Sequence, residues 1–196
     1  VQTVVKKSHT CTFIYLQEKK LERWLSKMKK VQRYFLDYNF LKNESIPESY
    51  NKNSFKIIQS DKKDYEINKF FYRQIGKDHF WRDRLVWTDK QWLKYTSNPL
   101  LETWIFKYIN NDLIGYYEIE KHNNKEFELI NMGILSEFRS KGFGSLLLNH
   151  VLKQSYDNKA KKVWVHTCSL DHKFALANYL SRGFKVFKKE QIDFVA

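Results

Sequence analysis

The stretch Arg-Ser-Lys-Gly-Phe-Gly at residues 139–144 decides the fold, because it lies between a predicted strand and a predicted helix. Residues 127–135 (FELINMGIL) read as a strand, and residues 145–152 (SLLLNHVL) are apolar at helical spacing. Glycines let a backbone approach a ligand closely, and the first turn of a helix leaves N–H groups without an internal partner. With the charges of Arg139 and Lys141 beside them, these donors predict a loop that binds phosphate.

Two other phosphate-binding loops do not fit these residues. A Rossmann loop needs three glycines and an acidic residue about 20 positions later, and a Walker A loop needs Gly-Lys-Ser/Thr after a four-residue gap. The pattern Arg-x-x-Gly-x-Gly between a strand and a helix resembles the acetyl-CoA pyrophosphate loop of the GNAT superfamily of N-acetyltransferases. For the hexapeptide alone, the alternative is an ordinary connection whose glycines only serve the turn.

A second motif follows in the expected order. Residues 163–168 (VWVHTC) read as a strand, and a helix is predicted between Asp171 as N-cap and Gly183 just after its end. The order Ala-x-x-x-Tyr-x-x-x-Gly-Phe at residues 175–184 resembles the second GNAT signature, in which the tyrosine lies near the cofactor thiol. Together with strings upstream, the motifs resemble a bacterial GNAT subgroup of unassigned substrate over residues 55–190.

Composition bounds the class of protein. The chain has 196 residues, of which 42% are hydrophobic, and a formal net charge of +13. This length suits one domain with a hydrophobic core. The sequence has no apolar run of about 18 residues, so no transmembrane helix is predicted. The two cysteines suggest no disulfide framework, so we expect a cytoplasmic protein without a membrane partner. The basic charge leaves a nucleic-acid partner open but does not favour one.

The basic N-terminal part has apolar residues at helical spacing, namely Leu21, Trp24, Leu25, Met28, Val31 and Phe35. Residues 17–36 are therefore predicted to form an amphipathic helix. We interpret its lysine-rich face as solvated surface, with docking on RNA or an anionic membrane as the alternative. A polar, turn-rich linker follows at residues 42–54. We expect a basic extension over residues 1–54 and a GNAT-like acetyltransferase domain over residues 55–196.

The predicted domain begins with a strand at residues 55–59 and a helix at 61–75. The capping-box form of residues 88–91 predicts a short second helix. Strands are expected at residues 101–109 and 113–120 and from residue 126. A helix, a strand, a helix and a last strand follow. The predicted fold class is α/β (mixed α+β), and the order of its elements matches the GNAT plan, a central mixed sheet with helices on both faces. The usual seventh strand of the family would be short or missing.

Acetyl transfer to an amine requires a neutral nucleophile, a polarised thioester carbonyl and a proton for the departing thiolate. Glu128 stands where GNAT enzymes such as the histone acetyltransferases place a general base, often acting through water; a solvated strand carboxylate is the alternative. Tyr179 is the candidate general acid, because a phenol has a pKa of about 10, close to that of a thiol. A core aromatic is the alternative for Tyr179.

The resemblance implies acetyl-CoA as co-substrate, with backbone N–H groups near the strand end holding the pantetheine. The expected cofactor-binding residues are Ile134, Leu135, Arg139, Lys141, Gly142, Phe143, Gly144 and Ser145. The aromatic and basic segment 70–87 is expected to wall the acceptor pocket, suiting a partly apolar acceptor that carries a carboxylate. The predicted substrate-binding residues are Tyr72, Trp81 and Arg84. No metal is expected, because His166, Cys168 and His172 are thin evidence for a site.

We therefore expect the chain to be an acetyl-CoA-dependent N-acetyltransferase from a bacterium, either a monomer or a homodimer. A primary amine of a small molecule or peptide would attack the thioester directly, and the sequence does not identify that amine. The alternative function is a non-catalytic module on a GNAT-like fold that senses acyl-CoA or binds RNA.

Overall fold

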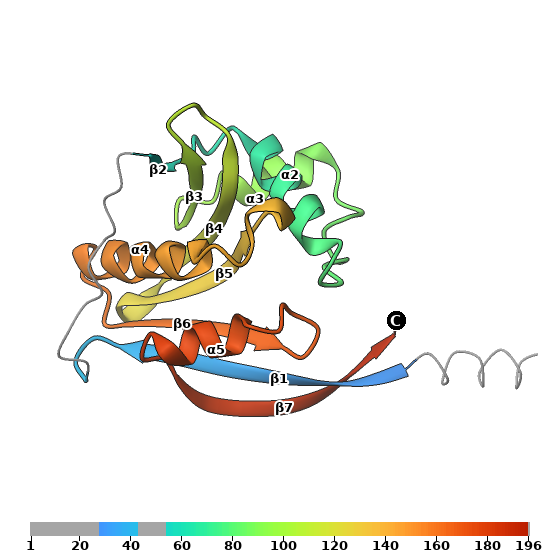
Figure 1. The fold of residues 1–196 in the computed structure, drawn as a ribbon, viewed down its shortest axis with the longest axis vertical. Helices are drawn as coiled ribbons and strands as arrows, with labels where there is room; N and C mark the ends of the chain where they lie inside the picture. Colours follow the sequence, from blue (N-terminus) through green and yellow to red (C-terminus); the bar gives the residue numbers. More distant parts are fainter. Residues whose placement is uncertain (1–27, 43–53, 196) are drawn as a thin grey trace, which may run out of the picture.

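A computed structural model describes residues 28–42 and 54–195 (Figure 1). In that part of the chain, strands and α-helices follow one another as β1 (Met28–Asn39), β2 (Phe55–Gln59), α2 (Tyr65–Gly76), α3 (Asp89–Thr96), β3 (Leu101–Tyr108), β4 (Leu113–His122), β5 (Glu126–Ile134), α4 (Phe143–Asp157), β6 (Lys162–Cys168), α5 (Ala175–Ser181) and β7 (Lys185–Val195). No helix in these ranges is both long and apolar enough to cross a membrane.

The strands form one seven-stranded sheet in the order β2-β3-β4-β5-β6-β1-β7. Neighbours are antiparallel except β5 and β6, which are parallel. These two strands pair only from Glu126 to Glu128, opposite residues 162–164, yet β5 continues to Ile134 and β6 to Cys168. The sheet therefore parts in its middle, beyond the last parallel pair.

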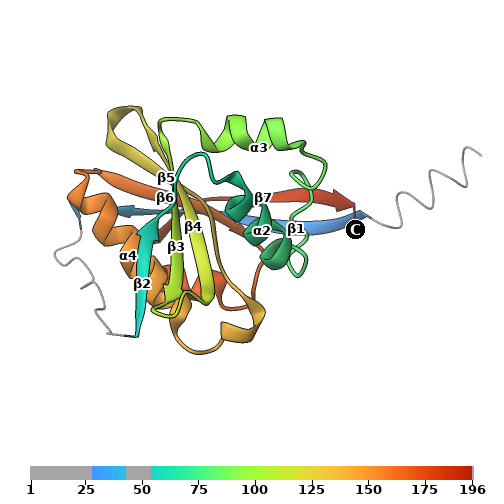
Figure 2. The same ribbon diagram turned by 90° about the horizontal axis from the view of Figure 1, so that it is seen from above.

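Helices cover both faces of the sheet, because alternate strand residues face opposite ways. On one face, Phe106 and Tyr117 pack with the apolar side of α4 and with Tyr179 of α5. On the other, Ile105 and Tyr116 pack with residues of α2. Figure 2 shows α4 and α2 on opposite sides of β3 and β4. The expected mixed sheet with helices on both faces is confirmed.

Strand β1 overturns part of the predicted N-terminal helix. Residues 28–36 of that helix are extended and pair with β7, and from Arg33 onward they also pair with β6, as Phe35 does with Lys188 and with His166. The helical spacing misled because residues 31 and 35 also share one face of a strand, and pairing with neighbouring strands outweighs a local preference. Residues 17–27 of the predicted helix lie outside the described residues, as do residues 43–53 of the predicted linker.

The strand that the sequence did not predict, and that brings the sheet to seven strands, is therefore β1, which precedes the predicted domain. Figure 1 shows β1 lying between β6 and β7. The described part of the predicted basic extension is therefore a strand of the central sheet.

The elements predicted after residue 55 appear in the expected order. The capping box of α3 is formed, since the Thr88 side chain accepts from the Gln91 backbone N–H. Helix α5 is shorter than predicted, beginning at Ala175, because the Asp171 carboxylate accepts from Thr167 Oγ1 and from the Cys168 N–H and so holds the turn after β6. Gly183 ends the helix with φ of 88°, as its prediction as C′ residue required.

Candidate active site

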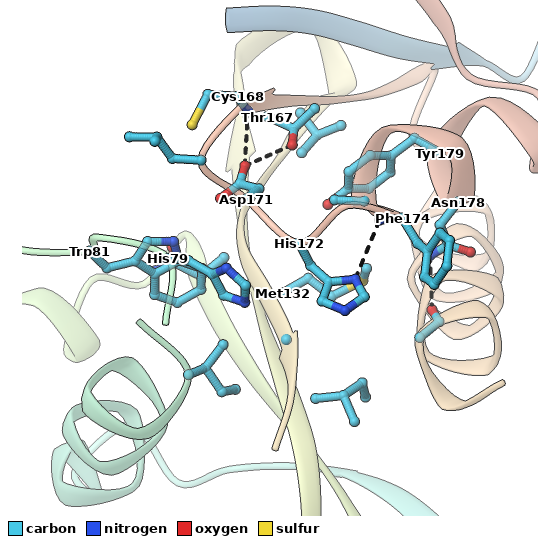
Figure 3. A pocket seen from close by; sticks show the side chains of 18 of the residues that line it. His79, Trp81, Met132, Thr167, Cys168, Asp171, His172, Phe174, Asn178 and Tyr179 are labelled. Carbon is cyan, nitrogen blue, oxygen red and sulfur yellow. Dashed lines mark hydrogen bonds between the residues drawn. The ribbon is translucent and has the colours of Figure 1, made fainter. Parts of the chain in front are cut away.

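A cavity of about 590 Å³ opens where β5 and β6 part. Its walls are the diverging ends of these two strands, the loop at residues 139–145, the segment after α2, and the outer strands β1 and β7. Figure 3 shows the β5 end in the centre, with residues of the segment after α2 on one side and those of α5 on the other. A concave site with a few polar groups is the usual form of a small-molecule pocket.

The turn before α4 presents unused backbone donors at this cavity. Gly142 is the N-cap with φ of 80°, a left-handed conformation that favours glycine, and a Cβ there would meet nothing within 4 Å. The N–H groups of Phe143 and Gly144 donate no hydrogen bond to the described part of the chain. Free donors at a helix N-terminus attract an anion. The geometry predicted for residues 142–144 is present.

Helix α5 fastens the same turn through Asn178. Ser145 Oγ donates to Asn178 Oδ1 at 2.9 Å, and Asn178 Nδ2 donates to the Gly144 carbonyl at 3.3 Å. Figure 3 shows Asn178 beside the first turn of α4. The two motifs found in the sequence therefore meet in space, and Asn178 is a positioning residue that the sequence motifs did not single out.

Tyr179 lines the cavity from α5, with 6% of its surface exposed. Its ring packs edge-on against Phe184, with the centroids 5.6 Å apart, and its hydroxyl has no hydrogen-bond partner among the described residues. Burial, followed by the charge of Asp171, raises the pKa of Tyr179. The phenol is therefore protonated at neutral pH, as a proton donor must be.

Residues 62–184 match the family model of the acetyltransferase (GNAT) family. The chain belongs to the GNAT acetyltransferase family. A mycothiol acetyltransferase of Corynebacterium efficiens is 25% identical over 88 residues, which are 45% of this chain and 29% of that protein. The chain thus spans less than a third of the length of this curated relative.

Solved structures agree on the fold. A GCN5-related N-acetyltransferase from Sphaerobacter thermophilus superposes with a TM-score of 0.64 at 13% identity, over 96% of this chain and 57% of that one. A functionally unknown conserved protein from Staphylococcus epidermidis gives 0.59 at 16% identity, over 99% and 69%. An aminoglycoside acetyltransferase from an uncultured soil metagenomic sample gives 0.58 at 13% identity, over 67% and 89%. At these identities, the likeness shows the GNAT fold alone.

Arg139 of the loop at residues 139–145 already makes two hydrogen bonds within the protein. Its Nε donates to the Ile134 carbonyl at 3.1 Å and its Nη1 to Asp78 at 2.9 Å, while its buried Nη2 has no partner among the described residues. Arg139 and Ile134 both line the cavity. Arg139 therefore shapes the loop with two of its nitrogens.

Other predicted cofactor residues fall into two groups. Phe143 and Ser145 line the cavity, whereas Lys141 and Leu135 are not among the residues that line it. Lys141 lies on the surface with its Nζ 5.3 Å from the Phe138 ring. The Leu135 N–H donates to the carbonyl of Ile114 at 2.9 Å, so this donor is not free to hold pantetheine in this structure.

Glu128 lies at the last parallel pair of β5 and β6, just before the strands part. Its Oε2 is 3.1 Å from His122 Nε2, and it is not among the residues that line the cavity. Burial raises the pKa of Glu128, and the contact with His122 opposes that rise. The structure thus brings Tyr179 to the cavity and leaves Glu128 beside it.

Of the three predicted acceptor residues, Trp81 lines the cavity, and Tyr72 and Arg84 lie behind it. The buried Tyr72 packs against Trp81 and donates its hydroxyl proton to Asp83. Arg84 Nη1 lies 3.1 Å from Glu118, a charge that holds its guanidinium away from the cavity.

Glu118 of β4 is the main residue that the sequence did not reveal. It is 0% exposed and accepts four hydrogen bonds, from Asn68 at 2.6 Å, Arg84 at 3.1 Å, Tyr95 at 2.7 Å and Asn131 at 2.7 Å. Asn131 also lines the cavity, so the network fixes the β5 wall. One signal was present in the sequence, because a carboxylate that alternates with buried strand residues needs donors.

His79 and His172 face each other across the cavity from two different loops. Their ring centroids are 6.1 Å apart, with the planes nearly perpendicular, and Figure 3 shows the two rings on either side of Met132. Burial, and then the charge of Arg139, lowers the pKa of both imidazoles, which are therefore neutral at pH 7. Among the described residues, no three His, Cys, Asp or Glu side chains are grouped so as to hold a metal ion.

Proposed function

We propose that this protein transfers the acetyl group of acetyl-CoA to a primary amine of a small molecule or peptide by direct attack. The observation that carries the proposal is the turn at residues 142–144, whose free N–H groups open onto the cavity between β5 and β6. Membership of the acetyltransferase family supports it. The residues present fit the co-substrate, because free donors, open space around Gly142 and the cavity adjoin one another.

Binding follows from these groups. The N–H groups of Phe143 and Gly144 would take the pyrophosphate, and the diverging ends of β5 and β6 would flank the pantetheine. In the reaction the amine nitrogen forms a bond to the acetyl carbon, the carbon–sulfur bond breaks, and the amine loses one proton. Tyr179 would supply a proton to the departing sulfur, because its hydroxyl is protonated and has no other partner among the described residues.

Glu128 is the proposed base, acting through water because its carboxylate does not line the cavity. Glu128→Gln should slow turnover most at low pH, where more of the amine needs deprotonating, with partial recovery as pH rises. A pH–rate profile of both proteins measures this. If the pH–rate profile of Glu128→Gln equals that of the wild type, another group is the base. A substitution of His79, which lines the cavity, would then be the next variant to test.

The deciding experiment measures free thiol release from acetyl-CoA over a panel of primary amines, with binding of acetyl-CoA followed by calorimetry. We expect binding without an acceptor and thiol release that depends on one amine class. Binding without release for any amine would favour a non-catalytic module that senses acyl-CoA. Absence of both acetyl-CoA binding and thiol release would contradict the proposed function.

A further inference from the structure

The end of the cavity away from the phosphate-binding turn is built by the outer strands β1 and β7. Val31 lies opposite Ile192, and Arg33 lies opposite Glu190, in the antiparallel register. Directly opposite residues share a face of a sheet. Val31, Arg33 and Ile192 all line the cavity, so this face of the outer strands forms its wall.

Most of this wall is apolar and aromatic. Phe194 of β7 packs against Phe80 of the segment after α2, with the ring centroids 5.7 Å apart, and both line the cavity with Trp81. This contact joins the segment after α2 to the last strand and closes the wall around Val31 and Ile192. Such a surface suits a ligand with an apolar or aromatic body.

Arg33 is the cation in this apolar end, and its charge is only partly matched. Its Nη1 is 3.4 Å from Glu190 Oε1, a long contact, and Lys188 Nζ binds the same carboxylate at 2.8 Å. Arg33 Nε is buried and has no hydrogen-bond partner among the described residues, although 34% of the side chain is exposed. The other arginine that lines the cavity, Arg139, uses its Nε on a backbone carbonyl.

The free edge of Arg33 has the geometry of a carboxylate site. Nε and Nη2 of a guanidinium project two parallel N–H groups, which match the two oxygens of a carboxylate. An unpaired buried donor costs stability, and a ligand that accepts from it recovers that cost. The wall and the cation together define a ligand that is apolar in its body and anionic at one end.

We propose that Arg33 anchors a carboxylate of the acceptor, which is an amine with an aromatic or apolar body, as in an aromatic amino acid. This inference rests on the proposed function and names the acceptor class. The sequence led to a similar acceptor through Arg84, but Glu118 holds that side chain, and the cation is supplied by the N-terminal strand.

Matched pairs of acceptors test the class. Thiol release is measured with tryptophan against tryptamine and with phenylalanine against phenethylamine, pairs that differ only in the carboxylate. We expect kcat/KM for the acids to exceed that for the amines by about 10-fold or more, the range for a charge-assisted pair. Equal rates, or a preference for the amines, would overturn the inference and leave acetyl transfer itself standing.

Variants test the residue. Arg33→Met keeps an unbranched apolar stem without the charge and should bring the acid-to-amine ratio close to one by slowing the acids alone, while Arg33→Lys should restore part of the ratio. Lys188→Met is the matched control, because it frees the same Glu190 and does not line the cavity. A ratio that is unchanged in Arg33→Met, with the fold intact by circular dichroism, contradicts the role of Arg33.

Calorimetry separates this inference from the proposed function. Binding of tryptophan to the protein loaded with CoA should be detectable in the wild type and in Lys188→Met and lost in Arg33→Met. That result without any thiol release would retain the carboxylate site and reject the transfer reaction. No binding of either acid to the wild type would reject the carboxylate site. Arg33→Gln replaces the methionine variant if the latter does not fold.

Discussion

The two ends of the cavity are built in different ways. The phosphate end, proposed to bind the pyrophosphate of acetyl-CoA, comes from one continuous stretch, residues 139–145, fastened by Asn178 of α5. The acceptor end, proposed to bind the amine, comes from β1, β7 and the segment after α2, which are far apart in the sequence. The first uses backbone N–H groups, and the second uses side chains held by long-range contacts. A short motif can therefore specify the co-substrate end, whereas the acceptor end depends on the completed fold.

The largest effect should follow from Glu118→Gln, since the wall near the acceptor end depends on this buried carboxylate. The change leaves the Arg84 guanidinium without its charged partner, and removing one member of a buried pair costs about 3–5 kcal/mol. We expect the free energy of unfolding in urea to fall by this amount. Glu137→Gln, an exposed change in the loop region, is the control and should stay within about 0.5 kcal/mol of the wild type.

Gly142→Asp should act at the phosphate end and leave the fold in place. A carboxylate at the point of closest approach repels the pyrophosphate, and we expect acetyl-CoA affinity to fall by about 10²-fold or more by calorimetry. Gly142→Asn has the same shape and tolerates the left-handed conformation, so it isolates the charge from backbone strain. Equal losses in the two variants would show that strain, and not repulsion, weakens binding.

Tyr179→Phe lies between the two ends and should change chemistry without changing affinity. The ring packing against Phe184 is kept and only the hydroxyl is lost. Turnover should fall by about 10²-fold, the lower part of the range for a positioned acid, while the Kd for acetyl-CoA stays within about 2-fold. Wild-type turnover in this variant would show that Tyr179 only packs in the core and is not the general acid.

The smallest effect concerns the helix that carries the phosphate end. His150 of α4 lies 3.0 Å from the Tyr117 hydroxyl, and burial lowers the pKa of His150 to about 4. Between that pKa and about 6.5, the unfolded chain binds a proton that the folded chain does not, so stability falls as pH drops through this range. Urea midpoints at pH 7 and pH 5 should differ less in His150→Gln than in the wild type. A fall that is as steep in the variant assigns the acid sensitivity to other groups.

The same contrast explains what the sequence could predict. The order of elements from residue 55 onward, the capping box of α3 and the turn at Gly142 follow from local chemistry, which short stretches carry in full. Tyr179 lines the cavity because α5, the helix of the second motif, is fastened through Asn178 to the first turn of α4.

The rest depends on pairs of distant residues. Arg33 reaches the cavity only because β1 enters the sheet, and the spacing of residues 31 and 35 fits one face of a helix or of a strand alike. Arg84 was predicted to face the acceptor, but its Nη1 donates to Glu118, 34 residues later. Side-chain direction at such positions is set by partners that no local pattern reveals.

The position of β1 also sets the order in which the molecule can be completed during synthesis. β1 is the first described strand to leave the ribosome, whereas its partners β6 and β7 come last; Arg33 meets Glu190 across 157 residues. Until then both edges of β1 stay open, and pairings over such separations form slowly. The wall of β1 and β7 can therefore assemble only after the turn at residues 142–144 has been made, and a nascent chain released early would have that turn without the wall proposed to bind the acceptor.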